Sequence, residues 1–210
     1  GSEMCIRDSV NTGWIYYANE DLYVSPKGHD WNHGLSWNSP LMTIAYANQI
    51  IYTTKSAPRN IYIANGEYHV DDESKPIKLK SWLTLSGESK DGTIINGDGS
   101  GTIFHIENGD SITIQNMTIT NCGTGEAIYA KDSDVSIKNV HFSNHMKGAI
   151  NCQGRLNEFF TNFTSNLLLD NVSASFCIND YGGVINSSGS MTRIINSLFY
   201  EDSARWGGVI

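Results

Sequence analysis

Apolar and polar residues alternate in short segments along the second half of the chain, and each of these segments closes on an asparagine. Four segments share the form apolar-x-apolar-x-Asn. Alternation with a period of two predicts a strand with one buried face. Asparagine suits the turn after such a strand because its side chain tolerates a left-handed backbone. The predicted corner residues are Asn116, Asn139, Asn171 and Asn196, and we expect all four to stack in one ladder along successive coils.

A second motif repeats in step with the first. It places small and apolar residues together at Ala127-Ile128, Ala149-Ile150, Val184-Ile185 and Val209-Ile210. The asparagines are 23, 32 and 25 residues apart, and the second motif recurs at 22, 35 and 25. Both motifs lengthen in the same interval, so we expect an insertion near residues 154–165 that leaves the phase unchanged. A helix-free repeat of about 22 to 30 residues predicts the coils of a parallel β-helix, whereas a leucine-rich repeat would need leucines that these segments lack.

One helix is expected before the repeats. Ser39 precedes Pro40, as in a helix N-cap followed by proline at the first helical position. Leu41, Ile44 and Ala47 follow at helical spacing, which predicts an amphipathic helix over 40–54. We expect residues 10–56 to form an N-terminal cap whose helix covers the open apolar end of the solenoid.

The coils are then expected over 57–210. Residues 1–9 begin with Gly-Ser and resemble a cloning scar followed by translated adaptor DNA, so we exclude them from the fold. The chain stops at Ile210 inside a further Gly-Gly-Val-Ile motif. We therefore expect the natural protein to continue.

Charge and composition exclude two classes of function. The chain carries 14 Lys and Arg against 22 Asp and Glu, a formal net charge of −8, so a phosphate backbone would be repelled and no nucleic-acid partner is expected. No apolar run approaches the roughly 20 residues that span a bilayer, so no membrane insertion of this fragment is expected.

The cysteines match no metal or redox motif. Outside the excluded segment they are Cys122, Cys152 and Cys177, spaced 30 and 25 residues apart. Such spacing leaves two interpretations, buried free thiols in the core or a disulfide between neighbouring coils.

Two resemblances extend this picture over about residues 23–210. The run Tyr23-Val-Ser-Pro-Lys-Gly28 through Gly34, with Trp37, Pro40 and the segment 61–68, resembles the amino-terminal region of pectate-lyase-like right-handed β-helix proteins. The later Gly-Gly-Val-Ile and Phe-x-x-Asn steps, such as 176–179, resemble repeats of chlamydial polymorphic outer-membrane proteins and of adhesin-like surface proteins of methanogenic archaea. The segments 142–145 and 199–202 depart from this pattern because they lack its final asparagine.

The resemblances imply an all-β fold, a right-handed parallel β-helix solenoid with an N-terminal capping helix, at an extracellular or cell-surface location. They imply an adhesin-like rigid stalk or binding surface for glycan or cell-surface ligands, without a catalytic or metal cofactor. We expect a monomer, with end-to-end contact possible at the uncapped C-terminal coil.

The alternative is a carbohydrate-active β-helix enzyme, a polysaccharide lyase or a glycoside hydrolase. Its candidate catalytic residues are Lys138, Asp170 and Arg193, which the repeat register places on successive coils of one outward face. A lyase would need carboxylates that hold Ca²⁺ beside a basic residue, and this face offers a single carboxylate. Ca²⁺ is therefore expected only under the lyase alternative.

Exposed aromatic side chains are the candidates for glycan contact, because a solenoid presents long rows of side chains and aromatic rings can stack on sugars. The candidates are Tyr129 in a regular coil and, in the insertion, Phe159, Phe160 and Asn162. An insertion that interrupts the coil is the part of such a scaffold where ligand contact is most expected.

Overall fold

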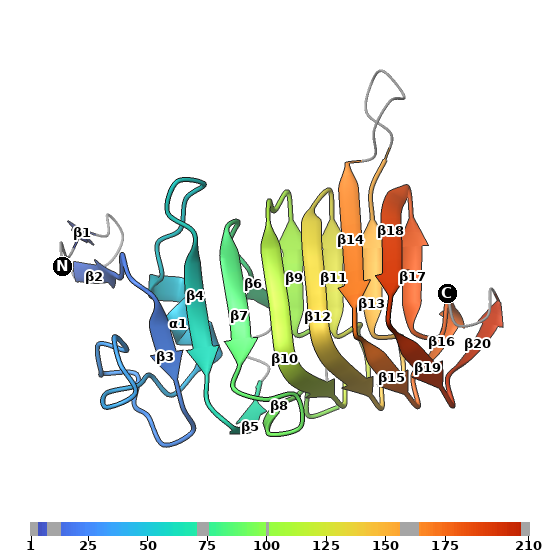
Figure 1. Cartoon of the computed structure of the whole chain (residues 1–210), viewed down its shortest axis with the longest axis horizontal. Coiled ribbons are helices and arrows are strands. Elements are labelled where there is room, and N and C mark those ends of the chain that lie inside the picture. The colour runs from blue at the N-terminus through green and yellow to red at the C-terminus, as the bar shows by residue number, and fades with distance from the viewer. Residues whose placement is uncertain (1–3, 8–13, 71–75, 100, 156–163, 207–210) are drawn as a thin grey trace.

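The chain forms an elongated solenoid, seen in a computed structural model that describes residues 4–7, 14–70, 76–99, 101–155 and 164–206. Its strands lie side by side along one axis, from β3 near one end to β20 near the other (Figure 1). Pairing between successive coils is parallel throughout. The predicted right-handed parallel β-helix is confirmed.

Two sheets carry the coils. The path of the large sheet runs through β3 (Leu22–Val24), β4 (Arg59–Ile63), β7 (Leu83–Gly87), β10 (Ile112–Thr120), β12 (Asp134–Ser143), β14 (Ser165–Asp170) and β18 (Ser190–Ile195). Four shorter strands also belong to it, namely β5 (Gly66–His69), β8 (Thr93–Asn96), β15 (Ser173–Ser175) and β19 (Leu198–Tyr200). The small sheet consists of β6 (Ile77–Lys78), β9 (Phe104–Glu107), β11 (Ile128–Lys131), β13 (Ile150–Gln153) and β17 (Ile185–Ser188).

Two strand pairs lie outside these sheets. β16 (Ile178–Tyr181) pairs in parallel with β20 (Ser203–Trp206) in the last described coils. At the other end, β1 (Met4–Arg7) pairs antiparallel with β2 (Trp14–Tyr17). Residues of the segment that we excluded from the fold thus form a strand.

The core is a set of columns of apolar side chains. Register places Ile114 beside Ile137, and Ile137 beside Leu169, so equivalent inward positions lie over one another. All three side chains are buried, as are the rings of Phe104 and Phe142. Alternation within each strand leaves the intervening polar side chains outside, which is why the sequence pattern predicted these strands.

The asparagine corners have the backbone that was expected of them. Asn116, Asn139, Asn171 and Asn196 have φ of 58°, 51°, 54° and 52°, in the left-handed region. Asn139 Nδ2 donates to Asn116 Oδ1 at 3.0 Å, and Asn171 Nδ2 donates to Asn139 Oδ1 at 3.0 Å. Asn196 occupies the same corner, but its Nδ2 donates to Asp170 Oδ1 at 3.0 Å. The amide ladder therefore has three members, and the prediction that Asn196 joins it was wrong because the Asn196 amide bonds to Asp170, the residue before Asn171.

The helix is shorter than predicted. α1 spans Ile44–Ile50, and its N-cap is Thr43, whose Oγ1 accepts the Tyr46 N–H at 3.2 Å. The prediction of Ser39 as N-cap was wrong because Leu41 is extended and exchanges backbone hydrogen bonds with Tyr23 and Ser25. The chain leaves the helix at Ile51, which is extended and forms a bridge with Ala18. Within the described ranges, no helix is long and apolar enough to cross a membrane.

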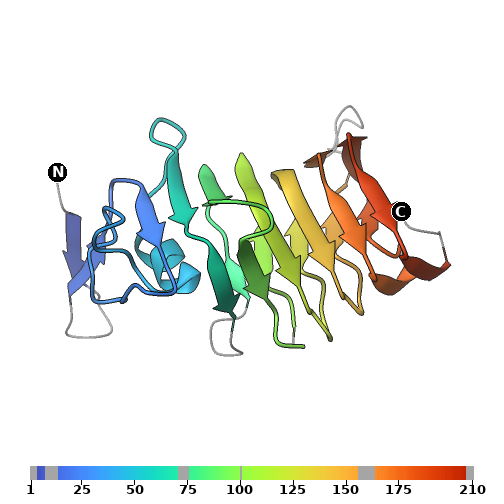
Figure 2. The same ribbon diagram turned by 60° about the horizontal axis from the view of Figure 1, so that its bottom comes forward.

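The two ends of the described solenoid are finished differently. At the N-terminal end α1 lies beside the first strands (Figure 2). Its Ile44, Ala47 and Ile50 are buried in the core. At the other end large apolar side chains are exposed, among them Ile178, Leu198 and Trp206. The helix therefore covers the N-terminal end of the described solenoid.

Three of the four cysteines are seen to be buried in the described part of the chain. Cys122, Cys152 and Cys177 make no disulfide, which decides between the two interpretations left open above. Burial raises the pKa of the Cys177 thiol to about 12, and the neighbouring Asp202 carboxylate adds to the effect. These thiols therefore pack as small apolar groups.

Candidate functional site

The outward side chains of the large sheet form a continuous surface, here called the polar face. Strand register assembles it in rows that run along the solenoid axis. One row consists of Asn60, Thr84, Thr113, Ser136, Leu168 and Arg193. The next consists of Tyr23, Tyr62, Ser86, Gln115, Lys138, Asp170 and Ile195. The polar face thus changes from aromatic, to hydroxyl and amide, to charged along its length.

The three candidate catalytic residues all lie on the polar face. Lys138 and Asp170 are register partners on neighbouring strands. Arg193 is the partner of Leu168 and therefore lies in the adjacent row. Among the described residues, no three His, Cys, Asp or Glu side chains converge where a metal ion could bind. The side chains of the polar face do not fit the calcium site that a lyase would need.

A groove of about 640 Å³ crosses the polar face near the strand starts, and we call it the axial groove. Lys55 and Trp82 line one end, and Met191 and Arg193 line the other. Between them lie residues from successive coils, including Asp134 and its register partner Asn166. The groove therefore runs across the strands, and its five strands from β7 to β18 span roughly 19 Å at about 4.8 Å per step.

Trp82 is the most unusual residue of the axial groove. It precedes β7 with φ of 61°, a left-handed conformation that is strained for a bulky side chain. Its backbone N–H donates to the Asp110 carbonyl at 2.8 Å, and its carbonyl accepts the Arg59 N–H at 3.1 Å. These bonds hold the strained backbone in place. Ser111, directly before β10, has a similar φ of 52°, so the left-handed corner recurs in the next coil and Trp82 differs by its bulky ring.

The ring of Trp82 is half-buried, and a cation lies over it. Lys55 Nζ is 5.7 Å from the ring centroid. Further along the groove the exposed polar groups are carboxylates, hydroxyls and an amide, with the Asp134 carboxylate accepting a hydrogen bond from Asn166 Nδ2. The groove thus combines one aromatic surface with a row of hydrogen-bonding groups.

Tyr129 lies elsewhere, on the outer face of the small sheet. Its ring lies against His105, with centroids 5.0 Å apart and planes at 31°. Its hydroxyl donates to Gln153 Oε1 at 3.2 Å. Gln153 ends β13, the strand before the predicted insertion, so Tyr129 neighbours the point where the insertion leaves the coil. Phe159, Phe160 and Asn162 fall outside the described residues.

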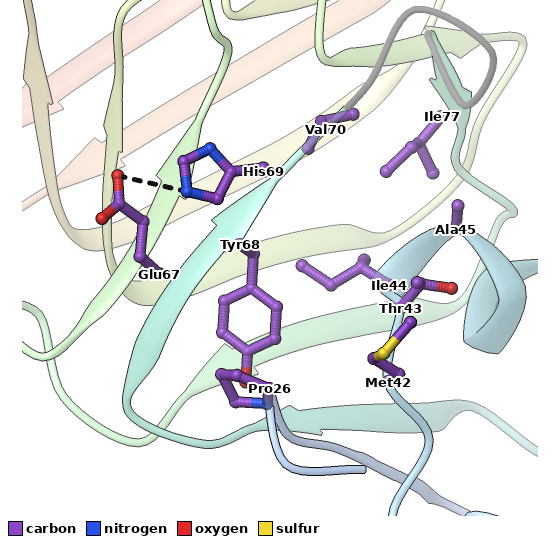
Figure 3. Close-up of a pocket in the computed structure, with 10 residues that line it drawn as sticks. All are labelled: Pro26, Met42, Thr43, Ile44, Ala45, Glu67, Tyr68, His69, Val70 and Ile77. Carbon is purple, nitrogen blue, oxygen red and sulfur yellow. Dashed lines mark ion pairs between the residues drawn. The ribbon is translucent and has the colours of Figure 1, made fainter. Parts of the chain in front are cut away.

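A smaller hollow of about 230 Å³ lies where α1 meets the first coil (Figure 3). Its apolar lining includes Ile44, Tyr68 and Ile77. Glu67 and His69 point away from this apolar lining, with the His69 Nε2 to Glu67 Oε1 distance at 3.8 Å. A hydrogen bond to Asp98 at 2.8 Å raises the pKa of His69. The hollow is the seam between cap and solenoid, with its ionic groups on the rim.

Sequence reasoning missed the residues that define the axial groove. Arg193 was singled out, but Trp82 and Lys55 belong to the connections before β7 and β4 and repeat in no other coil. The only available signal was a lone tryptophan just before a strand.

Comparison with known proteins gives likeness in structure alone. The sequence matches no protein-family model and no curated protein sequence. Among solved structures, the chain is similar to a rhamnogalacturonan lyase, with a TM-score of 0.50 and 12% identity over 85% of this chain and 56% of that one. It is also similar to a mutant pectin methylesterase in complex with a hexasaccharide, with a TM-score of 0.45 and 15% identity over 86% of this chain and 66% of that one. The chain spans less than two thirds of either protein. The likeness to the lyase shows that this chain has the pectin-lyase-like right-handed β-helix fold.

Proposed function

We propose that this protein is an extracellular, adhesin-like β-helix that binds a glycan chain along its polar face without transforming it. The observation that carries the proposal is the axial groove, which crosses successive coils and has the strained Trp82 at one end. A groove along the solenoid axis suits a linear polymer because successive coils can contact successive sugar units along it.

The chemistry of the groove matches that of a sugar chain. A pyranose ring has an apolar face of C–H groups, which packs on an aromatic ring such as Trp82. Its hydroxyls need both donors and acceptors, and Ser111, Ser136 and Asn166 offer them along the groove. Few polar groups at fixed positions on a partly apolar wall are the usual basis of orientation and specificity in ligand sites.

Charge favours a neutral glycan over a polyuronate. Asp110 and Asp134 are exposed carboxylates in the groove, and the whole chain carries −8. Lys55 and Arg193 supply cations only at its two ends. A polyanion would therefore meet carboxylates in the middle of its path and a repulsive overall field.

Binding measurements with a polysaccharide panel test the proposal. Neutral galactan, arabinan, mannan and cello-oligosaccharides are titrated against the protein beside polygalacturonate, alginate and chondroitin. We expect at least one neutral glycan to bind, and Trp82→Ala and Trp82→Gly each to weaken that binding about tenfold or more. Because glycine adopts positive φ without strain, Trp82→Gly should be more stable than Trp82→Ala by about 1 kcal/mol.

Trp206→Ala is the matched control, since Trp206 is an exposed tryptophan outside the groove. It should bind like the unaltered protein. The proposal would be contradicted if the Trp82 variants bound the glycan as tightly as the unaltered protein does, or if no member of the panel bound.

The alternative, a carbohydrate-active enzyme, is supported by the register pairing of Lys138 with Asp170 on the same face. Incubation with polygalacturonate, alginate and chondroitin in the presence of Ca²⁺ tests it through the ultraviolet absorbance of unsaturated products. Product that accumulates with the unaltered protein and disappears in Lys138→Ala would replace the binding proposal with a lyase.

A further inference from the structure

Three aromatic residues gather where the cap meets the polar face. Tyr23 and Tyr62 are register partners whose rings stack with centroids 5.3 Å apart and planes at 30°. Trp37, from the cap loop, meets the ring of Tyr23 edge-on at 4.9 Å and 70°. The indole therefore stands against Tyr23, whose other ring neighbour is Tyr62, and 49% of Trp37 is exposed.

The Trp37 indole lines one side of a second hollow, here called the cap cleft. It measures about 360 Å³ and is lined by Trp37, Tyr62, Ile63, Ala64, Ser86, Gly87 and Glu88. Apart from Trp37, these residues lie at or just after the ends of β4 and β7, whereas Trp82 and the axial groove lie at the starts of the strands. Three residues of β7, 83–85, lie between Trp82 in the groove and Ser86 in the cleft, a separation of roughly 13 Å along the strand, and the two hollows share no lining residue.

Hydrogen bonds to Asp21 hold β4, the strand that carries Tyr62. Asp21 Oδ1 and Oδ2 accept hydrogen bonds from the Asn60 backbone N–H and Nδ2, at 2.7 and 3.0 Å, which ties the start of β4 to the cap. Burial, followed by the nearby Asp21 carboxylate, raises the pKa of Tyr62. Tyr62 therefore stays a neutral phenol at physiological pH and presents an uncharged ring.

Two polar groups complete the cleft. Glu88 Oε2 accepts the Asn65 N–H at 2.8 Å, which orients the carboxylate and leaves acceptor capacity on its other oxygen. Ser86 Oγ accepts a hydrogen bond from Gln115 Nε2 at 3.1 Å, so the serine hydroxyl hydrogen remains available to donate. The cleft thus holds a strong acceptor and a donor beside an exposed aromatic wall.

We propose that the cap cleft is a second carbohydrate site, which binds a single neutral pyranose unit against Trp37 and Tyr62 with its hydroxyls hydrogen-bonded to Glu88 and Ser86. The exposed aromatic faces take the apolar C–H face of the sugar, and the carboxylate accepts from adjacent hydroxyls. The same carboxylate repels uronic acids. The site is independent of the axial groove and needs only one sugar unit, not a polymer.

Titration with small glycosides, monitored by saturation-transfer-difference NMR, tests this site apart from the groove. The probes are the methyl glycosides of glucose, galactose, mannose and glucuronic acid at millimolar concentrations. We expect at least one neutral glycoside to bind, the glucuronide to bind more weakly, and Trp37→Ala to weaken neutral binding about tenfold. Glu88→Gln should reduce the discrimination against the glucuronide.

Trp31→Ala is the matched control, because Trp31 is a more exposed tryptophan of the same cap that does not line the cleft. It should leave glycoside binding unchanged, and thermal unfolding should show that Trp37→Ala remains folded. Glycosides that bind Trp37→Ala and the unaltered protein equally, or that bind neither, would overturn the second site. Polysaccharide binding that is lost in Trp82→Gly but kept in Trp37→Ala would separate the two proposals.

Discussion

Each strand of the large sheet has an inner and an outer face, and the two are built by different rules. Inside, equivalent positions carry equivalent residues, as in the column of Ile114, Ile137 and Leu169. Outside, the adjacent row changes from coil to coil, from Ser136 to Leu168 to Arg193. The inner columns hold the coils together, and the outer rows are free to vary because solvent tolerates many side chains there. Stability and recognition should therefore respond to different substitutions.

The largest expected effect comes from emptying the interior. Phe142 is fully buried, so Phe142→Ala leaves a cavity and should lower the free energy of unfolding by about 3–5 kcal/mol. Urea unfolding measures the loss, with Ser136→Ala on the outer face as the control. A loss of unfolding free energy below about 1 kcal/mol would mean that the interior is not closely packed around Phe142.

The next effect depends on pH and comes from His145, which is also inside. The pKa of His145 is lowered to about 4, chiefly by burial, with a smaller contribution from the neighbouring His141, while the Ile119 carbonyl at 3.0 Å from Nε2 partly opposes the shift. The unfolded chain has a histidine pKa near 6.5, so it binds more protons than the folded chain between the two values.

Stability from His145 should therefore be fully present above about pH 6.5 and fall by roughly 3 kcal/mol as the pH drops to about 4. Unfolding free energies measured across that range should show a shallower fall in His145→Gln than in the unaltered protein. His105→Gln, on the outer face, is the control and should keep the full dependence. Parallel curves for all three proteins would contradict the interior role of His145.

A smaller effect is expected at the boundary between inside and outside, in the asparagine ladder. Asn139 bonds to both Asn116 and Asn171 and has φ of 51°. Asn139→Ala loses the bonds and strains the backbone, at a cost of about 2 kcal/mol, whereas Asn139→Gly loses the bonds alone, at about 1 kcal/mol. If thermal unfolding shows that Asn139→Ala is more stable than Asn139→Gly, the ladder geometry is contradicted.

The smallest effects on stability should arise on the outer face. Arg193→Ala and Lys138→Ala should each change the free energy of unfolding by about 0.5 kcal/mol or less. Their effects on glycan binding should differ, because Arg193 lines the axial groove and Lys138 does not. A several-fold loss is expected for Arg193→Ala only, as measured by calorimetric titration. Equal losses of glycan binding in the two variants would mean that the binding site also includes the row of the polar face that contains Lys138.

The difference between the inner and outer faces of the sheet also explains which features the sequence predicted. Coils, inner strands and asparagine corners follow a repeating pattern, so spacing alone located Asn116, Asn139 and Asn171 correctly. The helix boundaries were wrong because tertiary pairing of Leu41 with β3 overrides the local capping signal at Ser39.

The sites could be predicted only in part. Arg193 was found because it lies within a repeat, whereas Trp82 and Lys55 lie in connections that do not repeat. The cap cleft depends on Trp37 folding back over Tyr23 and Tyr62, which are distant in sequence. No pattern of spacing reports such a contact.

The most direct test of glycan binding along the polar face is a titration of the ¹⁵N-labelled tryptophan indoles, each assigned from a single-residue variant. On addition of the neutral glycan selected by the panel, the Trp82 indole N–H resonance should shift with saturation while that of Trp206 stays fixed. A glycan that binds while the Trp82 resonance does not move would contradict the account.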